Sequence, residues 1–395
     1  MGEMKGGARE KNGEQEKGGE MERQGIRSAE ELKREREGLY WLTLTPGWGA
    51  VKIRRLGEHM GSYSGIFNIE EKELRKLDFI YQKEIEQFSG HKRNVEACVR
   101  ELARLETQGI RFVTPLDADY PQRLRQICDY PMGLYVKGKL PDDRIPTAAV
   151  IGARACSAYG RETARMLGRE LAAAGVQVVS GLAAGVDGAG HRGALEAGGE
   201  TFGVLGCGVD ICYPRENYGL FAEMLSHGGV LSEYGLGEKP LPGNFPLRNR
   251  IISGLADVVV VVEARKRSGS LITVDLALEQ GKDVFAVPGR LTDPLSEGCN
   301  HLIQQGAYLC TSPSDILEYL GMDGCKKQRF QKKSGKGLAK KEKMLYSCLD
   351  LQPKHLEEIA LACALPVGEC LDLLTELELR GYVTAEGGQY YGIKL

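Results

Sequence analysis

Five consecutive valines, residues 258–262, stand between Asp257 and Glu263. A strand with one solvated face alternates apolar and polar side chains, whereas this run is apolar on both faces, as in the middle of a parallel sheet. Parallel neighbours must be joined by crossover connections, which are usually helices. The run therefore restricts the chain to folds in which helices cover both faces of a sheet.

The region from residue 147 to residue 320 repeats a strand, a glycine-rich turn and a helix. Short apolar runs predict strands, and longer amphipathic segments that end in glycine predict helices. We expect strands at residues 147–151, 176–180, 201–205, 230–234, 258–262 and 284–287, and helices at residues 159–175, 190–198 and 271–281. This alternation is typical of a doubly wound parallel α/β sheet, in which ligands bind at the carboxyl ends of the strands.

Composition shifts divide the chain into five parts. Residues 1–36 are charged and glycine-rich with few apolar side chains, so we expect a disordered tail. Residues 37–108 form a helical domain around Pro46-Gly-Trp-Gly49, which is either a plain helical hairpin or one that offers backbone N–H groups to DNA. Residues 109–320 form the α/β domain, residues 321–343 a basic linker, and residues 344–395 have the outline of a winged helix.

The bulk composition excludes several classes of protein. A net charge of −2 gives no global attraction for nucleic acid, so any such binding depends on a local patch. The eleven cysteines include no Cys-x-x-Cys pair and no nearby histidine cluster, so we expect reduced thiols, a cytoplasmic location, and neither a metal nor another cofactor. No apolar run of about 18 residues is present, and we expect no membrane association.

The first strand of the α/β domain leads into Gly152-Ala-Arg154 and then Ser157 at the start of a helix. This turn is not Gly-x-Gly-x-x-Gly, and no acidic residue ends the second strand to hold a ribose, so an NAD-linked enzyme is disfavoured. Gly152 allows a ligand to approach, Arg154 places a positive charge at the strand end, and the helix N-terminus adds N–H donors. Small anions and backbone phosphates both suit this turn.

The second and fourth strands end in polar residues with more than one possible role. Ser180 and Gly181 are followed by Asp187 and His191, which lie four residues apart on one helical face. They are either an acid–base pair or a structural hydrogen bond, and the absence of an accompanying nucleophile favours the structural role. Glu233 ends the fourth strand and either orders nearby arginines or contacts a ligand.

Basic and aromatic residues flank the valine run. Phe245, Arg248, Asn249 and Arg250 precede it, and Arg265 to Arg267 lead into Ser268-Gly269-Ser270. Arginine presents planar donors to phosphate, a phenyl ring offers a face to a base, and a Ser-Gly-Ser turn before a helix is an N-cap and an anion-binding nest. Several phosphate-binding strand ends around one crevice favour a nucleic-acid strand or a nucleotide over a neutral metabolite.

These residues belong to a longer series of motifs. The series runs Gly152-Ala-Arg154, Ser180-Gly-Leu-Ala-Ala-Gly-Val-Asp187 with His191, Tyr213-Pro214, Ser232-Glu233, Phe245-Pro-Leu-Arg-Asn-Arg250, Ser268-Gly-Ser-Leu-Ile-Thr273 and Val287-Pro-Gly289. It resembles the bacterial DNA-processing protein A family (DprA, also called Smf) over about residues 110–320. The resemblance implies an extended Rossmann-like domain, an N-terminal helical domain similar to SAM domains, and a C-terminal winged helix.

The resemblance also implies a function. Members of the family bind single-stranded DNA, form homodimers and help to load the RecA recombinase, also past single-strand-binding protein, in natural transformation and recombination. They have no established catalytic activity. By this resemblance we expect Arg154 to contact the DNA backbone and Phe245 to contact a base. The remaining candidates for DNA contact are Ser157, Arg248, Asn249, Arg250, Ser268, Gly269 and Ser270.

The chain departs from the family at one pocket position. Some relatives carry a lysine just ahead of the Phe-Pro element, where this chain has Leu241-Pro-Gly-Asn244, with Lys239 further back. Lys239 and Asn244 are therefore candidates for that contact. Of the two arginines that follow, we expect Arg248 to bind DNA and Arg250 to serve the fold through Glu233 or Glu263.

Two other functions compete with this hypothesis. A nucleotide hydrolase of the lysine-decarboxylase-like group would share the topology but needs a Pro-Gly-Gly-x-Gly-Thr-x-x-Glu element, and residues 268–273 lack its glutamate. A duplex-binding regulator would use the winged helix. However, its expected recognition helix, about residues 367–380, carries four acidic residues and one basic residue and would be repelled by phosphates. We expect that domain to contact protein.

Overall fold

The computed structural model describes residues 28–92, 94–322, 338–349, 353–385 and 387–393. Most of the predicted disordered tail and basic linker lies outside these ranges. The expected end of the tail at residue 36 is wrong, because the first helix begins at Ala29. Ser28 caps that helix and forms a reciprocal capping box with Glu31, a local signal that stabilises a helix start even in a charged sequence.

The N-terminal unit, which ends at Val99, is helical as expected. Its elements are α1 (Ala29–Thr43), α2 (Ala50–Met60), η1 (Ser64–Asn68), α3 (Glu71–Leu74) and α4 (Gln82–Lys92), with α5 (Val95–Thr107) beginning at its end. Trp41 is fully buried and meets Phe88 edge-on at 5.0 Å. Buried Glu35 accepts hydrogen bonds from Ser62 and Ser64 and holds η1 against α1.

The α/β domain contains a nine-stranded sheet in the order β1-β2-β6-β5-β4-β3-β7-β8-β9. The strands are β1 (Ile110–Val113), β2 (Leu134–Gly138), β3 (Thr147–Ile151), β4 (Gln177–Ser180), β5 (Thr201–Val204), β6 (Gly228–Ser232), β7 (Val258–Val261), β8 (Asp283–Ala286) and β9 (Tyr308–Leu309). All pairs from β6 to β9 are parallel, whereas β1 and β2 add antiparallel strands at one edge. The predicted parallel sheet is confirmed, with the valine run as β7.

The strand order reverses beside β3. From β3 the chain moves outward through β4, β5 and β6, and then returns to place β7 on the other side of β3. Open α/β sheets bind ligands at such a reversal, because the loops leaving the two neighbouring strands diverge and leave a crevice between them. The topology therefore predicts a candidate binding site at the carboxyl ends of β3 and β7.

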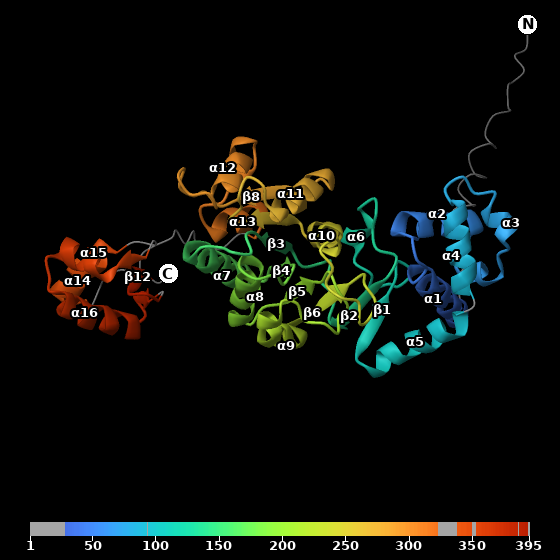
Figure 1. Ribbon diagram of the computed structural model, residues 1–395, viewed down its shortest axis with the longest axis horizontal. Coiled ribbons are helices and arrows are strands. Elements are labelled where there is room, and N and C mark those ends of the chain that lie inside the picture. Colours follow the sequence, from blue (N-terminus) through green and yellow to red (C-terminus); the bar gives the residue numbers. More distant parts are fainter. Residues whose placement is uncertain (1–27, 93, 323–337, 350–352, 386, 394–395) are drawn as a thin grey trace, which may run out of the picture. The chain divides into compact units, whose positions relative to one another are not determined.

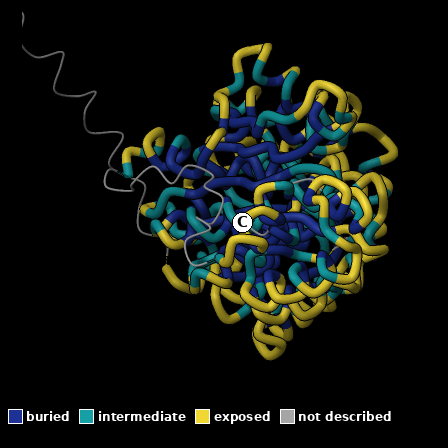
Figure 2. The backbone as a smooth tube through the Cα atoms, turned by 90° about the vertical axis from the view of Figure 1, so that its left-hand side faces the viewer, coloured by how far each residue is buried: buried dark blue, intermediate teal, exposed yellow. Residues whose placement is uncertain are grey.

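Helices cover both faces of the sheet (Figure 1). The helices of this domain are α6 (Gln122–Arg125), α7 (Ala158–Ala173), α8 (Val186–Glu196), η2 (Arg215–Asn217), α9 (Tyr218–His227), α10 (Asn244–Leu255), α11 (Gly269–Glu279), α12 (Glu297–Gln304) and α13 (Pro313–Tyr319). Ala148 and Val150 pack with α7, α8 and α13, whereas Ala149 and Ile151 pack with α6, α10, α11 and α12. In Figure 2, buried backbone segments are enclosed by exposed ones.

Helix α10 was not expected from the sequence. Its residues Asn244–Leu255 include the Phe-Pro-Leu-Arg-Asn-Arg element, which we treated as a lead-in to the valine strand. Pro246 is tolerated because it lies in the first turn, where the backbone N–H has no intrahelical acceptor. The helical conformation decides which side chains of this element share a face.

The C-terminal part is a winged helix, as predicted. It comprises α14 (Lys340–Cys348), β10 (Lys354–His355), α15 (Leu356–Cys363), α16 (Val367–Leu379), β11 (Val383–Ala385) and β12 (Tyr390–Ile393). Its core is a separate cluster that includes Leu345, Ile359, Leu374 and Ile393. None of the helices in the described residues is both long enough and apolar enough to cross a membrane.

Candidate nucleic-acid interface

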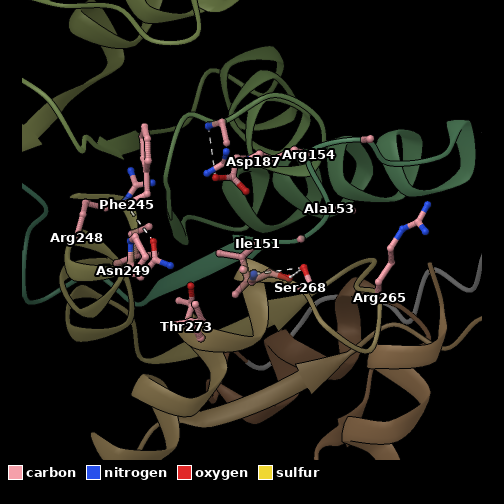
Figure 3. A pocket seen from close by; sticks show the side chains of 18 of the residues that line it. Ile151, Ala153, Arg154, Asp187, Phe245, Arg248, Asn249, Arg265, Ser268 and Thr273 are labelled. Carbon is pink, nitrogen blue, oxygen red and sulfur yellow. Dashed lines mark hydrogen bonds between the residues drawn. The ribbon is translucent and has the colours of Figure 1, made fainter. Parts of the chain in front are cut away.

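A cavity of about 580 Å³ opens at the carboxyl ends of β3 and β7, between the N-terminal parts of α10 and α11. Phe245, Arg248, Asn249 and Ile252 line one side of it from α10, because residues at i, i+3, i+4 and i+7 share a helix face. Figure 3 shows this wall opposite Ser268 and Arg265, with Arg154 and Asp187 above. The structure thus brings the turn after β3, the start of α10 and the turn after β7 together around one cavity, as expected for segments that share a crevice.

Phe245 provides an aromatic surface inside this pocket. Its ring lies against Gly206, where an added Cβ would come within 2.9 Å of Cδ1, so only glycine leaves room for the ring. The Tyr213 ring is tilted beside it with a centroid separation of 5.6 Å, and the Arg154 guanidinium lies 5.2 Å from its centroid. Phe245 also lines the cavity, and an aromatic side chain in a positively charged groove can stack with a base.

The pocket carries an excess of positive charge. Arg154, Arg265 and Arg267 line it and are exposed, and none forms an ion pair with another described residue. Asp187 is the one acidic side chain among the described lining residues. Unpaired arginines around a concave site favour a polyanionic ligand, because binding replaces solvent contacts with charge-assisted hydrogen bonds.

Arg248 lines the pocket, but its side chain is buried and forms hydrogen bonds within the fold. It is only 4% exposed, and its Nη1 donates to the carbonyl oxygens of Gly181 at 3.0 Å and Val204. Burial lowers the pKa of Arg248 to about 10, opposed by the negative charge of Asp187. Nε and Nη1 of Arg248 therefore already have partners within the fold, and its expected direct contact with DNA stays a prediction.

Arg250 serves the fold, as expected. Its Nη2 contacts both carboxylate oxygens of Glu233, at 2.9 and 2.8 Å, and its Nε lies 3.0 Å from the Asp129 carboxylate. The side chain is 10% exposed and is absent from the pocket lining. Glu233 thus orders an arginine, and the Arg250 side chain does not contact the space where a ligand of this pocket would bind.

Asp187 and His191 are both structural, but they do not bond to each other. Asp187 accepts hydrogen bonds from the backbone N–H groups of Gly181 and Ala183, at 3.1 and 3.4 Å. His191 Nδ1 lies 2.6 Å from Thr201 Oγ1, whose hydroxyl donates to the Val178 carbonyl. The predicted Asp–His hydrogen bond is therefore wrong, because Asp187 bonds to the loop after β4, whereas His191 contacts Thr201 on β5.

His191 is expected to make the fold sensitive to acid. Burial, aided by the positive charge of Arg248, lowers its pKa from 6.5 to about 3, so the folded protein keeps it neutral while the unfolded chain protonates it below about pH 6.5. Stability is fully present above pH 6.5 and falls as the pH drops toward 3. Between pH 7 and pH 5, the His191→Met protein should lose about 2 kcal/mol less stability than the wild-type protein loses. Urea unfolding at both pH values measures the two losses. Equal losses in both proteins would contradict this assignment.

Ser157 and Glu263 hold the start of α7. The Glu263 carboxylate, 1% exposed, accepts from Ser157 N at 2.8 Å and Ser157 Oγ at 2.5 Å. Ser157 Oγ in turn caps Gly160 N at 3.0 Å. Ser157 is absent from the pocket lining, so the structure does not support its expected contact with DNA. The Glu263 carboxylate thus takes the place of the anion that we expected to bind at the N-terminus of α7.

Two other strand-end residues act within the fold. Ser180 Oγ donates to the Val150 carbonyl at 2.6 Å. An added Cβ at Gly152 would lie 2.8 Å from Val186 Cγ2 and 2.9 Å from the Glu263 carbonyl oxygen. Gly152 lines the pocket, but it is required by the close packing of α8 and β7 rather than by ligand approach alone.

The other predicted contacts divide into those inside and outside the pocket. Ser268, Gly269 and Ser270 line it, and Ser268 caps α11 by accepting from Ser270 N at 3.3 Å. Asn244 donates from Nδ2 to the Gly206 carbonyl at 3.2 Å and does not line the pocket. Lys239 is exposed and also lies outside the lining, although the neighbouring Pro240 belongs to it.

Several lining residues were missed or undervalued. Tyr213 was named only within the Tyr213-Pro214 motif, although it flanks Phe245, and Arg265 and Arg267 were noted without being named as contacts. Three prolines, Pro240, Pro242 and Pro246, complete the rim. Arg265 and Arg267 lie just ahead of Ser268 in the chain, so the sequence could have indicated that they contact the ligand. Tyr213 reaches the site only because its loop packs there, which the sequence does not indicate.

Comparisons with known proteins match these features to one family. The family model described as DNA recombination-mediator protein A matches residues 111–321, and the DprA winged helix domain matches residues 331–389. Protein Smf of Escherichia coli is 41% identical over 287 residues, which cover 71% of this chain and 77% of the relative. Protein Smf of Synechocystis is 32% identical over 392 residues, covering 90% and 98%.

A solved structure agrees with the sequence matches. The X-ray structure of DNA processing protein A from Streptococcus pneumoniae superposes with a TM-score of 0.61 at 38% identity. The match covers 72% of this chain and 95% of that chain. It therefore supports the same fold across most of the described α/β region.

Proposed function

The chain belongs to the DNA recombination-mediator protein A family, and from this premise we propose that it binds single-stranded DNA in the β3/β7 pocket and helps a RecA recombinase to assemble there. The observation that carries the proposal is the combination of an aromatic surface, Phe245 with Tyr213, and three arginines without ion pairs to described residues, Arg154, Arg265 and Arg267. Phosphate contacts and base stacking together bind single strands with little dependence on sequence.

The proposed role requires no catalysis. Among the described lining residues there is no histidine, cysteine, lysine or glutamate, and the single carboxylate, Asp187, already accepts two backbone hydrogen bonds. A hydrolase needs a general base with access to water or substrate. This chemistry argues against the nucleotide-hydrolase alternative.

We further propose that the protein acts as a homodimer and displaces single-strand-binding protein while it loads RecA. Support for self-association comes from β9 at the edge of the sheet, where Tyr308 and Leu309 are 47% and 49% exposed. Exposed apolar side chains on an edge strand favour pairing with another polypeptide.

The winged helix is proposed to contact protein rather than duplex DNA. Residues 344–395 carry three lysines and arginines against eight aspartates and glutamates. On α16, the helix that a winged helix would present to a major groove, Asp372 is exposed and Leu371 is 39% exposed. An acidic and partly apolar surface is poorly matched to phosphates.

Fluorescence anisotropy with a labelled oligonucleotide of about 30 bases, single-stranded and as duplex, tests the proposal directly. We expect clear preference for the single strand, because paired bases cannot reach Phe245. A second measurement follows RecA ATPase on DNA coated with single-strand-binding protein, where the protein should shorten the lag. Equal affinity for duplex, protection of a duplex by the winged helix, or steady release of base from a nucleoside monophosphate would overturn the proposal.

A further inference from the structure

The segment that follows Tyr213 runs along the margin of the pocket. Tyr213 itself lines the cavity and is 43% exposed. Four residues later, Asn217 Nδ2 donates to the carbonyl oxygens of Leu182 and Ala183, at 3.0 and 3.2 Å, and Ala183 also lines the cavity. Both ends of the segment are therefore fixed beside the pocket, whereas the residues between them lie outside its lining.

Helix η2 brings a cation and an aromatic ring to one side of this segment. The Tyr218 N–H donates to the Arg215 carbonyl oxygen and closes a single 3-10 turn. Side chains three residues apart are eclipsed in such a turn, so Arg215 and Tyr218 project in the same direction. The acidic neighbour Glu216 is rotated away from them by about 120°, because a 3-10 helix has three residues per turn.

Arg215 and Tyr218, here called the η2 platform, are both available to a ligand. Tyr218 is 67% exposed, and its ring contacts no other aromatic or cationic side chain in the described ranges. Arg215 is exposed, and its guanidinium has no hydrogen bond or ion pair with any residue that the structure describes. A single exposed tyrosine is common on protein surfaces. A tyrosine beside an unpaired arginine supplies the two contacts that single strands require, stacking and phosphate binding.

On the basis of the proposed function, we propose that the single strand bound in the pocket continues past Tyr213 onto the η2 platform, where Arg215 binds a phosphate and Tyr218 stacks with a base. Two extended residues and one 3-10 turn separate Tyr213 from Tyr218, which is at most about 13 Å. About four stacked nucleotides cover that length. The pocket and the platform then form one continuous site, and only strands longer than those that fill the pocket reach both.

Strand length provides the test of this path. Oligo-dT of about 4 and about 20 bases is bound to the full chain and to Tyr218→Ser, with competition against a labelled strand giving the affinity of the short one. We expect Tyr218→Ser to weaken binding of the long strand about five-fold, the lower end for one base–aromatic stack, and to leave the short strand unaffected. Tyr218→Phe should restore most of the affinity, because it keeps the ring. Equal effects on both lengths, or none on the long strand, would overturn the inference.

Arg215→Ala tests the phosphate contact separately. The long strand should bind about three-fold more weakly, and the slope of log affinity against log salt concentration should fall by about 0.7, the value for one phosphate of a single strand. Arg144→Ala is the control, because Arg144 is 88% exposed, pairs with Asp142 and does not line the pocket. An unchanged slope in Arg215→Ala would remove Arg215 from the path.

Tyr218→Trp detects the stacked base directly. The two native tryptophans, Trp41 and Trp48, are buried in the N-terminal unit at 0% and 5% exposure, so a change in fluorescence on adding DNA reports on position 218. The long strand should quench this fluorescence and the short strand should not. This variant decides the question if Tyr218→Ser fails to fold. Wild-type protein that does not bind the long strand contradicts the proposed function itself, whereas tight binding without quenching contradicts only the η2 platform.

Discussion

Arg154→Ala is expected to weaken binding of single-stranded DNA about ten-fold, the effect of one lost charge-assisted contact. Arg154 is exposed at the pocket, lies over the Phe245 ring and has no ion pair with a described residue, so its donors are available to phosphate. Loss of one phosphate contact should also reduce the slope of log affinity against log salt concentration by about 0.7. Anisotropy titrations at several salt concentrations measure both quantities.

Arg144→Ala is the matched control for Arg154→Ala. Its side chain is 88% exposed and pairs locally with Asp142, and it is absent from the pocket lining. The same loss of charge there should change neither affinity nor slope appreciably. Arg154→Lys should keep the slope, because it keeps the charge, while it loses the planar contact with Phe245. An Arg154→Ala protein with wild-type affinity at every salt concentration would remove Arg154 from the interface.

Arg250→Met is expected to lower the free energy of unfolding by about 3 kcal/mol, the effect of removing one partner from a buried ion pair. Arg250 is 10% exposed and bridges Glu233, at the end of β6, to Asp129. Its removal leaves the half-buried Glu233 carboxylate without a counter-charge. Urea unfolding followed by circular dichroism measures the loss, and the midpoint should shift without a change in slope.

The double variant Arg250→Met with Glu233→Gln separates the ion pair from packing. Removal of both charges should recover part of the lost stability, since no carboxylate then remains without a partner. The folded Arg250→Met protein should retain the wild-type salt dependence of DNA binding, in contrast to Arg154→Ala. A stable Arg250→Met protein with a reduced salt slope would reverse the roles assigned to these two arginines.

Much of the fold was predictable because it follows from local patterns. The valine run identified a central strand, and the alternation of strands with glycine-ended helices identified the parallel sheet. The start of α1 was missed, because its capping box lies in a charged segment where composition suggested disorder. Helix α10 was missed because the proline in its first turn obscured the helical pattern.

The candidate site was only partly predictable. Arg154, Phe245, Asn249 and the Ser268–Ser270 turn line one cavity, as their positions at strand ends suggested. Arg248 and Ser157 were assigned to DNA by residue type and motif, but the fold gives them other partners. Residue type indicates what a side chain can bind, whereas its partner depends on which strands are neighbours.

The amino-acid sequence by itself determined the class of the sheet, the positions of its strand ends and the basic and aromatic character of the loops there. The tertiary structure decided which charged groups remain available to a ligand. Ser157 and Glu263 are 106 residues apart in the chain, and Arg248 and Gly181 are 67 apart. Such pairs form because β7 returns beside β3, a long-range arrangement that local periodicity does not encode.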